Sequence, residues 1–235
     1  MVGEPAKPME GRALLRLLQV SDSAFPTGAF AHSMGLEAFA EAGELTDAEN
    51  LGRVVGLHLD AMSTSDCVAL RAAHVAGFVE ELVRLDGLLS ATKLTRELRQ
   101  ASAATGRRFA ASVTALGVED DGLLGDFYRL AREGGTPGNA AVAHGVAAPR
   151  LGLGLEEALL GYLYATASSL VAAGQKLIPL GGSAAQRVLH GLGEEISRSA
   201  EKSRHTEVED MHAFAPLLDA RSMLHERQRT RLYIS

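Results

Sequence analysis

The segment SDSAFPTGAFAHSMGLE, residues 21–37, separates two helical patterns and decides how the chain on either side of it is arranged. It follows the apolar run Leu14–Val20. Pro26 fixes its own φ and biases Phe25 away from helical backbone angles. Gly28 permits a φ that other residues avoid. The segment is therefore expected to be a bent connection between two helices, held against a core by its phenylalanines and capped by its first polar residues.

The composition is that of a protein with one helical core. The chain has 235 residues, of which 46% are hydrophobic but only 5% aromatic, and it contains no tryptophan. Alanine and leucine must then fill the interior, which suits closely packed helices. The net charge of −6 gives no reason to expect nonspecific nucleic-acid binding.

One cysteine, Cys67, excludes an intrachain disulfide and a zinc site that needs two thiolates from this chain. Its apolar neighbours predict a buried, inert thiol. Residues 1–12 are polar and do not resemble a signal peptide. The longest uncharged apolar run, Ala158–Gln175, contains glycine, serine and threonine, which favours a core helix over a membrane span. A soluble cytoplasmic protein with no membrane contact is expected.

Apolar periodicity predicts an all-α, single-domain bundle of roughly eight to ten helices with flexible N- and C-terminal segments. Thr46 and Glu49 have capping-box spacing. The helices are expected over residues 14–18, 33–42, 46–62, 65–75, 88–116, 123–133, 139–148, 155–178 and 183–196, with a short one near the C-terminus. Gly43, Gly134, Pro149 and Pro179 are expected to end helices.

The expected domain organisation has three parts. Residues 1–12 form a flexible N-terminal tail, and residues 13–204 form the helical domain. Residues 205–235 form an acidic linker followed by a cationic, partly apolar C-terminal segment, and such a segment is typical of one that orders against a partner.

The sequence contains no recognisable arrangement of a nucleophile with a base. The chain has no G-x-S-x-G motif, P-loop or Rossmann glycine pattern. The stretch His205–His212 is a local group of possible metal ligands, but on a helix its two histidines lie about 10 Å apart, which favours a solvated linker. His58 lies on an apolar face and is expected to be a satisfied core histidine. A helical metal enzyme using His58, His74, His144 or His190 with nearby carboxylates is the open alternative.

A basic helix face lies in the middle of the chain, at Lys93, Arg96, Arg99, Arg107 and Arg108. A solvated face is the default interpretation. A docking surface for an acidic partner is the alternative.

Residues 21–37 resemble the N-terminal signature of the urease accessory protein F family (UreF). The matching positions are Ser21, Asp22, Ser23, Phe25, Pro26, Gly28, Phe30, Ser33, Gly35, Leu36 and Glu37. Two further stretches are similar to the family in the same order. In SLVAAGQKLIPLGGSAAQRVL the matches are Ser169, Leu170, Leu177, Pro179, Leu180, Gly181, Gln186 and Leu189, while Gly182 and Ala185 depart from the pattern.

The third stretch is PLLDARSMLHERQRTRLYIS at the C-terminus. It matches at Pro216, Leu218, Asp219, Ser222, Met223, His225, Glu226, Arg231, Leu232, Tyr233 and Ser235. The resemblance implies an all-α, homodimeric accessory factor without a catalytic site or cofactor. It also implies that the chain binds the D-type (or H-type) accessory protein, recruits the G-type GTPase to apo-urease, and couples GTP hydrolysis to nickel delivery.

The residues expected to bind partners come from these stretches. They are Ser21, Asp22, Ser23, Phe25, Pro26, Gly28, Ser33, Gly35, Glu37, Pro179, Gly181, Gln186, Asp219, Met223, His225, Glu226, Arg231, Leu232 and Tyr233. Within this set, Arg231 and Tyr233 are expected to contact the D-type partner. The elbow, residues 21–37, is expected to shape the surface or an interior path used in the complex.

Overall fold

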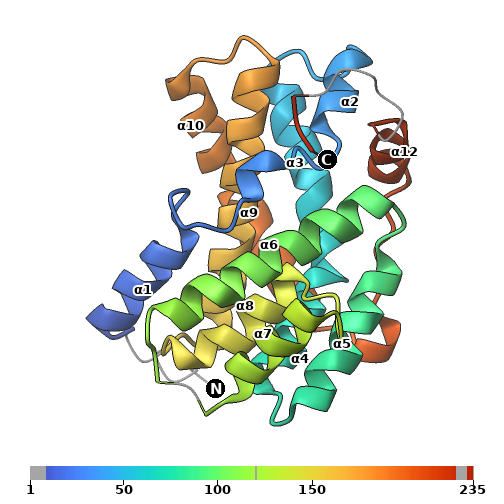
Figure 1. Cartoon of the computed structure of the whole chain (residues 1–235). Helices are drawn as coiled ribbons and strands as arrows, with labels where there is room; N and C mark the ends of the chain where they lie inside the picture. Colours follow the sequence, from blue (N-terminus) through green and yellow to red (C-terminus); the bar gives the residue numbers. More distant parts are fainter. Residues whose placement is uncertain (1–8, 120, 226–231, 235) are drawn as a thin grey trace, which may run out of the picture.

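The computed structural model describes residues 9–119, 121–225 and 232–234, and these residues are helical with no strand among them (Figure 1). The helices, in chain order, are α1 (Gly11–Ser21), η1 (Ala29–Ala31), α2 (Leu36–Glu41), α3 (Ala48–Ser63), α4 (Asp66–Val75), α5 (Val79–Thr92), α6 (Arg96–Ala115), α7 (Leu123–Glu133), α8 (Ala140–Arg150), α9 (Leu155–Leu177), α10 (Gly182–Gly191), α11 (Gly193–Ser203), η2 (Val208–Asp210) and α12 (Pro216–His225). The expected all-α class is confirmed.

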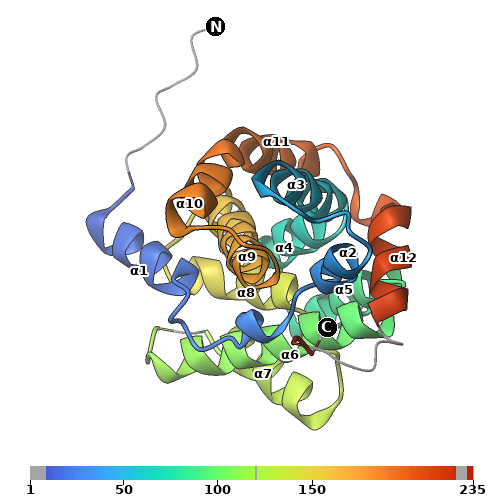
Figure 2. The same cartoon turned by 90° about the horizontal axis from the view of Figure 1, so that it is seen from above.

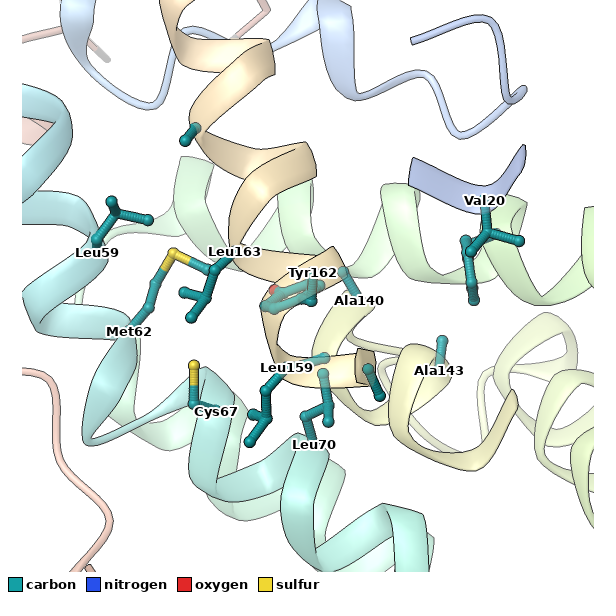
Figure 3. Packing of buried hydrophobic residues seen from close by; sticks show 14 of the residues in the cluster. Val20, Leu59, Met62, Cys67, Leu70, Ala140, Ala143, Leu159, Tyr162 and Leu163 are labelled. Atoms are coloured by element: carbon teal, nitrogen blue, oxygen red, sulfur yellow. The ribbon is translucent and has the colours of Figure 1, made fainter. Parts of the chain in front are cut away.

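The longest of these helices, α9, is the centre of the fold. Figure 2 shows it surrounded by α1, α2, α3, α8, α10 and α11. Its inward face is apolar, and the helix ends at Leu177 because Pro179 follows two residues later. Figure 3 shows how Leu59 and Met62 of α3, Cys67 of α4 and Leu163 of α9 gather in the shared core. Cys67 is fully buried, as its neighbours predict, and burial raises the pKa of its thiol.

A second layer forms where the alanine-rich helix α8 packs between α4 and α6. Five alanines of α8 are buried, so the helix backbones approach closely. Gly145 lies at the α4 contact. A Cβ added there would collide with the carbonyl oxygen of Leu70 and lie 2.8 Å from the Cβ of Ala73. Small residues therefore set the separation of these helices.

Replacing Gly145 by alanine is expected to lower the free energy of unfolding by about 1–3 kcal/mol, because the added methyl group must force two helices apart. The matched control is Gly87→Ala on α5, where an added Cβ meets nothing within 4 Å. That control should raise stability by about 0.5–1 kcal/mol, the usual helix preference for alanine. Urea unfolding measures both; equal effects of the two substitutions would contradict close α4–α8 packing.

The described residues form twelve α-helices, against the roughly eight to ten expected, because two predicted helices are each divided in two. The expected helix 88–116 breaks at Thr95, whose extended backbone and side chain cap α6 by accepting from the backbone N–H of Leu98. The helix predicted from residue 183 starts one residue earlier, and Leu192 separates it into α10 and α11.

Three smaller predictions of helix ends are corrected. The cap of α3 is Asp47 rather than Thr46, since Asp47 accepts from the backbone N–H of Asn50 at 2.9 Å. Pro149 lies inside the last turn of α8, which ends one residue later at Arg150. The helix after the elbow begins at Leu36, not Ser33, because Met34 and Gly35 have φ angles of 50° and 88°.

None of the described helices is long and apolar enough to span a membrane. α1 begins at Gly11, inside the segment predicted as a tail, and residues 1–8 lie outside the described part. The described part of residues 205–225 lies against the body. Arg71 donates to the carbonyl of Thr206, and Thr64 and His212 exchange two hydrogen bonds. The three-part division of the chain stays a prediction.

Candidate functional site

The N-terminal elbow and the C-terminal segment, which are far apart in sequence, lie side by side (Figures 1 and 2). Gly35 precedes α2 with a φ of 88°, which glycine adopts readily. A Cβ at Gly35 would lie 3.4 Å from the backbone nitrogen of Ser222 on α12. Gly35 therefore allows α12, which belongs to the C-terminal family stretch (residues 216–235), to approach the elbow closely.

The carboxylate of Glu37, on α2, binds the end of the chain. Its carboxylate is buried and accepts from the backbone N–H groups of Leu232 at 2.8 Å and Tyr233 at 3.2 Å. Burial raises the pKa of Glu37, but hydrogen bonds from Leu232, His225 and Tyr233 outweigh it and hold that pKa below its ordinary value. Glu37 is therefore ionised near neutral pH and orders residues 232–233.

His225 bridges this carboxylate to a second one. Its Nε2 lies 3.1 Å from a Glu37 oxygen, and its Nδ1 lies 2.7 Å from Glu97 of α6. The imidazole is fully buried. When both carboxylates are ionised, each ring nitrogen faces only an acceptor, so both must donate and the ring carries a positive charge. We call Glu37, His225 and Glu97 the buried triad.

Further contacts fasten the C-terminal segment around the triad. The hydroxyls of Thr95 and Ser222 lie 2.9 Å apart, and Arg221 pairs with Glu44. The ring of Tyr233 is buried, and its hydroxyl donates to the carbonyl of Ala173 on α9 at 3.3 Å. The segment is thus held by α2, α6 and α9 together.

Docking of residues 232–234 should weaken in acid. Because the docked state lowers the pKa of Glu37, ionised Glu37 stabilises docking above its ordinary pKa of 4.5, and this contribution is lost as the pH falls through the lowered value. Hydrogen exchange of these three amides measures docking. Protection that is independent of pH down to about 3, with the body still folded, would contradict the role of Glu37.

A cavity of about 150 Å³ lies beneath the elbow. All three stretches that resemble the UreF family contribute to its wall. Ser21, Asp22 and Ser23 come from the elbow, Ser169 and Leu170 from α9, and Leu218 and Asp219 from α12. Burial raises the pKa of the half-buried Asp219 carboxyl.

A buried ion pair forms one wall of this cavity. Lys93 lies 2.6 Å from the carboxylate of Asp66, whose other oxygen accepts from the hydroxyl of Tyr162 at 3.1 Å. Burial, followed by the Asp66 charge, raises the pKa of Tyr162. Burial lowers the pKa of His144, stacked on Phe109, to about 4. The interior is therefore nearly free of net charge.

The remaining predicted elbow residues are placed as follows. Phe25 is buried against Phe109 with ring centroids 5.7 Å apart, and Pro26 is exposed. Gly28 has a φ of 72° beside the guanidinium of Arg108. Ser33 is fully buried, and its hydroxyl has no hydrogen-bond partner among the described residues.

The partner-binding residues predicted from the second family stretch, SLVAAGQKLIPLGGSAAQRVL, lie away from the cavity and the triad. Pro179, Gly181 and Gln186 are exposed at the turn between α9 and α10 and in α10, and they line neither the cavity nor the triad. Met223 and Leu232 are exposed near the triad. Glu226 and Arg231 lie outside the described residues. The partner-binding roles of the whole set stay predictions.

Two expectations about polar residues need correction. His58 is buried as predicted but is not satisfied, because its Nε2 has no hydrogen-bond partner in the described structure. The basic face is exposed at Arg96, Arg99 and Arg108, as expected. Lys93 and Arg107 are half-buried instead: Lys93 pairs with Asp66, and Arg107 donates to the carbonyl of Pro137.

The described residues hold no group of three or more histidine, cysteine, aspartate or glutamate side chains placed to bind a metal ion. The stretch around His205–His212 forms no such group in this part of the chain. Two members of the site were missed from sequence. Glu97 completes the triad, and Asp66 anchors Lys93 and Tyr162.

Comparison with known proteins supports the resemblance. The UreF family profile matches residues 45–193. The urease accessory protein UreF of Paenarthrobacter aurescens (strain TC1) is 38% identical over 227 residues, covering 94% of this chain and 97% of the relative. That of Corynebacterium glutamicum (strain R) is 36% identical over 220 residues, covering 93% and 96%. That of Arthrobacter sp. (strain FB24) is 35% identical over 226 residues, covering 96% and 98%.

The fold and the site define an all-α protein whose C-terminal segment docks on its own N-terminal elbow through a buried histidine–carboxylate triad. Each relative named above carries the name urease accessory protein. The profile match and the near full-length similarity show that the chain belongs to the UreF family.

Proposed function

We propose that this chain is an adaptor in urease maturation with no catalytic site of its own. It binds the D-type accessory protein, recruits the G-type GTPase to apo-urease in the cytoplasm, and couples GTP hydrolysis to delivery of nickel, which is cargo rather than a resident cofactor. The names of its relatives support the role in maturation. The partners and the coupling follow from the family resemblance.

The observation that carries the adaptor role is the apolar surface of the docked C-terminal segment. Six residues of this segment keep exposed apolar side chains: Phe214, Leu217, Met223, Leu224, Leu232 and Ile234. Phe214 alone is 82% exposed. The triad fixes the backbone beneath this surface, so a partner would meet a preformed rather than a disordered site, which lowers the entropic cost of association.

A second exposed surface supports homodimerisation. Leu14, Leu15 and Leu18 of α1 are exposed, although the neighbouring Leu17 packs near Gly161 on α9. Tyr164, one turn beyond Gly161 on α9, is also exposed. Exposed leucines beside an exposed arginine, Arg12, have the composition of the centre of an interface.

Leu15→Glu is therefore expected to shift the chain from dimer to monomer by at least tenfold in dissociation constant, since it places a charge within an apolar contact. Sedimentation equilibrium measures the shift. Leu116→Glu is the control, because Leu116 is also exposed but caps the far end of α6. A monomeric wild-type chain, or the same shift in both variants, would refute this interface.

The proposed function is tested by complementation. Cells that express urease and its other accessory proteins, but lack this chain, should contain urease with little nickel and little activity. Restoring the chain should restore both nickel content and activity. Full activation without the chain at limiting nickel would refute the proposal.

A further inference from the structure

The outer face of α6 is positively charged, although the chain as a whole is negatively charged. α6 contains four arginines and one glutamate, whereas the chain has 23 lysines and arginines against 29 acidic residues. Arg96, Arg99 and Arg108 are exposed, and we call these three residues the arginine face. The glutamate, Glu97, is buried against His225 and presents no carboxylate at the surface. This helix therefore differs in charge from the rest of the chain.

Arg108 lies where α6 meets the elbow. A Cβ added at Gly28 would collide with its guanidinium group, so this charge lies directly against the elbow backbone. Residues 23–36 of the elbow contain no aspartate, glutamate, lysine or arginine. Among the described residues, Arg108 forms no salt bridge with a carboxylate. Its guanidinium donors are therefore available to a carboxylate from another molecule.

The N-terminal end of α6 lies beside the docked end of the chain, to which the buried triad joins it (Figure 2). The backbone N–H of Ile234 also donates to the carbonyl of Ala31 in the elbow at 2.9 Å. Three apolar side chains are exposed in this region: Leu94, Leu232 and Ile234. The arginines and these aliphatic side chains therefore lie on neighbouring parts of one face.

This combination of side chains fits an acidic protein surface better than a nucleic acid. Arginine pairs with carboxylates through two parallel hydrogen bonds and is enriched at the centres of protein interfaces. The aliphatic side chains beside the arginines would be buried by a protein partner, whereas unpaired bases stack on aromatic rings. The net charge of −6 also opposes binding of a polyanion to the chain as a whole.

We propose that the arginine face docks an acidic surface of the D-type protein, whose carboxylates pair with Arg96, Arg99 and Arg108. This inference rests on the proposed function, because it takes the D-type protein as the partner of the adjoining C-terminal segment. It adds the charge that the partner must carry and a second helix that it must contact. Exposed charges at an interface act mainly by steering the approach, so the arginine face should increase the association rate.

Surface plasmon resonance with the D-type protein as probe tests this on the full-length chain. The double variant Arg96→Gln/Arg108→Gln should slow association about tenfold at low salt and change dissociation little. Arg99 is kept, because it donates to two backbone carbonyls just before α6. The control, Arg198→Gln/Arg204→Gln, removes the same charge from exposed positions of α11, which lies on the opposite side of the molecule (Figure 2). It should change association by less than about twofold.

A second measurement needs no variant. Association of the wild-type chain with the D-type protein should slow about tenfold between about 50 and 500 mM NaCl, since salt screens exposed charges.

Two results would overturn the proposal and leave the proposed function standing: the D-type protein binds at a rate that salt does not change, or the double variant associates as fast as its control. A chain that does not bind the D-type protein at any salt concentration would overturn both. Binding of a single-stranded DNA oligonucleotide that is lost only in the double variant would also overturn this proposal, because it would assign the arginine face to nucleic acid.

Discussion

Replacing Glu37 by glutamine should release residues 232–234 from the elbow and increase the exchange rates of their amides by about 100-fold. The substitution removes the negative charge that accepts from Leu232, Tyr233 and His225. Hydrogen bonds to a charged group contribute about 1.5–3 kcal/mol each, so losing even part of this set releases the segment. It also leaves Glu97 as the one carboxylate that contacts His225.

Hydrogen exchange resolved by mass spectrometry measures this effect. Glu49→Gln is the control, because Glu49 is exposed in the first turn of α3. Unchanged protection of residues 232–234 in Glu37→Gln would show that Glu37 does not order the end of the chain.

Replacing Asp86 by alanine should lower the free energy of unfolding by about 4 kcal/mol. This fully buried carboxylate on α5 accepts from the hydroxyl of Thr136 at 2.6 Å, the backbone N–H of Gly138 at 2.5 Å, and both the backbone and side-chain nitrogens of Asn139 at 2.8 and 2.7 Å. Alanine would leave three buried donors unpaired, the hydroxyl of Thr136 and the backbone N–H groups of Gly138 and Asn139. The side-chain nitrogen of Asn139 would keep only its bonds to the Asp86 carbonyl and the Ser90 hydroxyl, so the loop between α7 and α8 would lose most of its attachment to α5.

Chemical unfolding of the Asp86→Ala variant tests this role. Asp126→Ala is the matched control, because Asp126 is exposed on α7 and pairs with the exposed Arg129. The control should change stability by less than about 1 kcal/mol. A loss of that size in both variants would mean that the Asp86 network contributes little.

The helices were predictable where an apolar pattern ends at glycine or proline. The bounds of α7, Leu123–Glu133, agree fully, because Gly134 adopts the left-handed conformation that ends it. The break at Thr95 was missed because apolar periodicity continues on both sides of it. The break at Leu192 was missed because Leu192 itself has helical backbone angles, so only a change of direction separates α10 from α11.

The site was predictable only in part. The family resemblance identified Glu37, His225 and Tyr233, but sequence spacing does not show that residues 188 positions apart share a hydrogen bond. Glu97 was missed because a glutamate in the first turn of a helix is ordinarily explained by the helix dipole. The unpaired Nε2 of His58 was missed because an apolar pattern indicates burial but does not show whether a buried polar atom has a hydrogen-bond partner.

The central claim, that the docked C-terminal segment is the surface that binds the D-type partner, is tested most directly by co-purification. Full-length chain and a chain ending at Phe214 are each expressed with the D-type and G-type proteins, and circular dichroism checks that the shortened body stays helical. The account predicts that full-length chain retains both partners and that the folded, shortened chain loses the D-type protein. Equal retention of the D-type protein by both chains would contradict it.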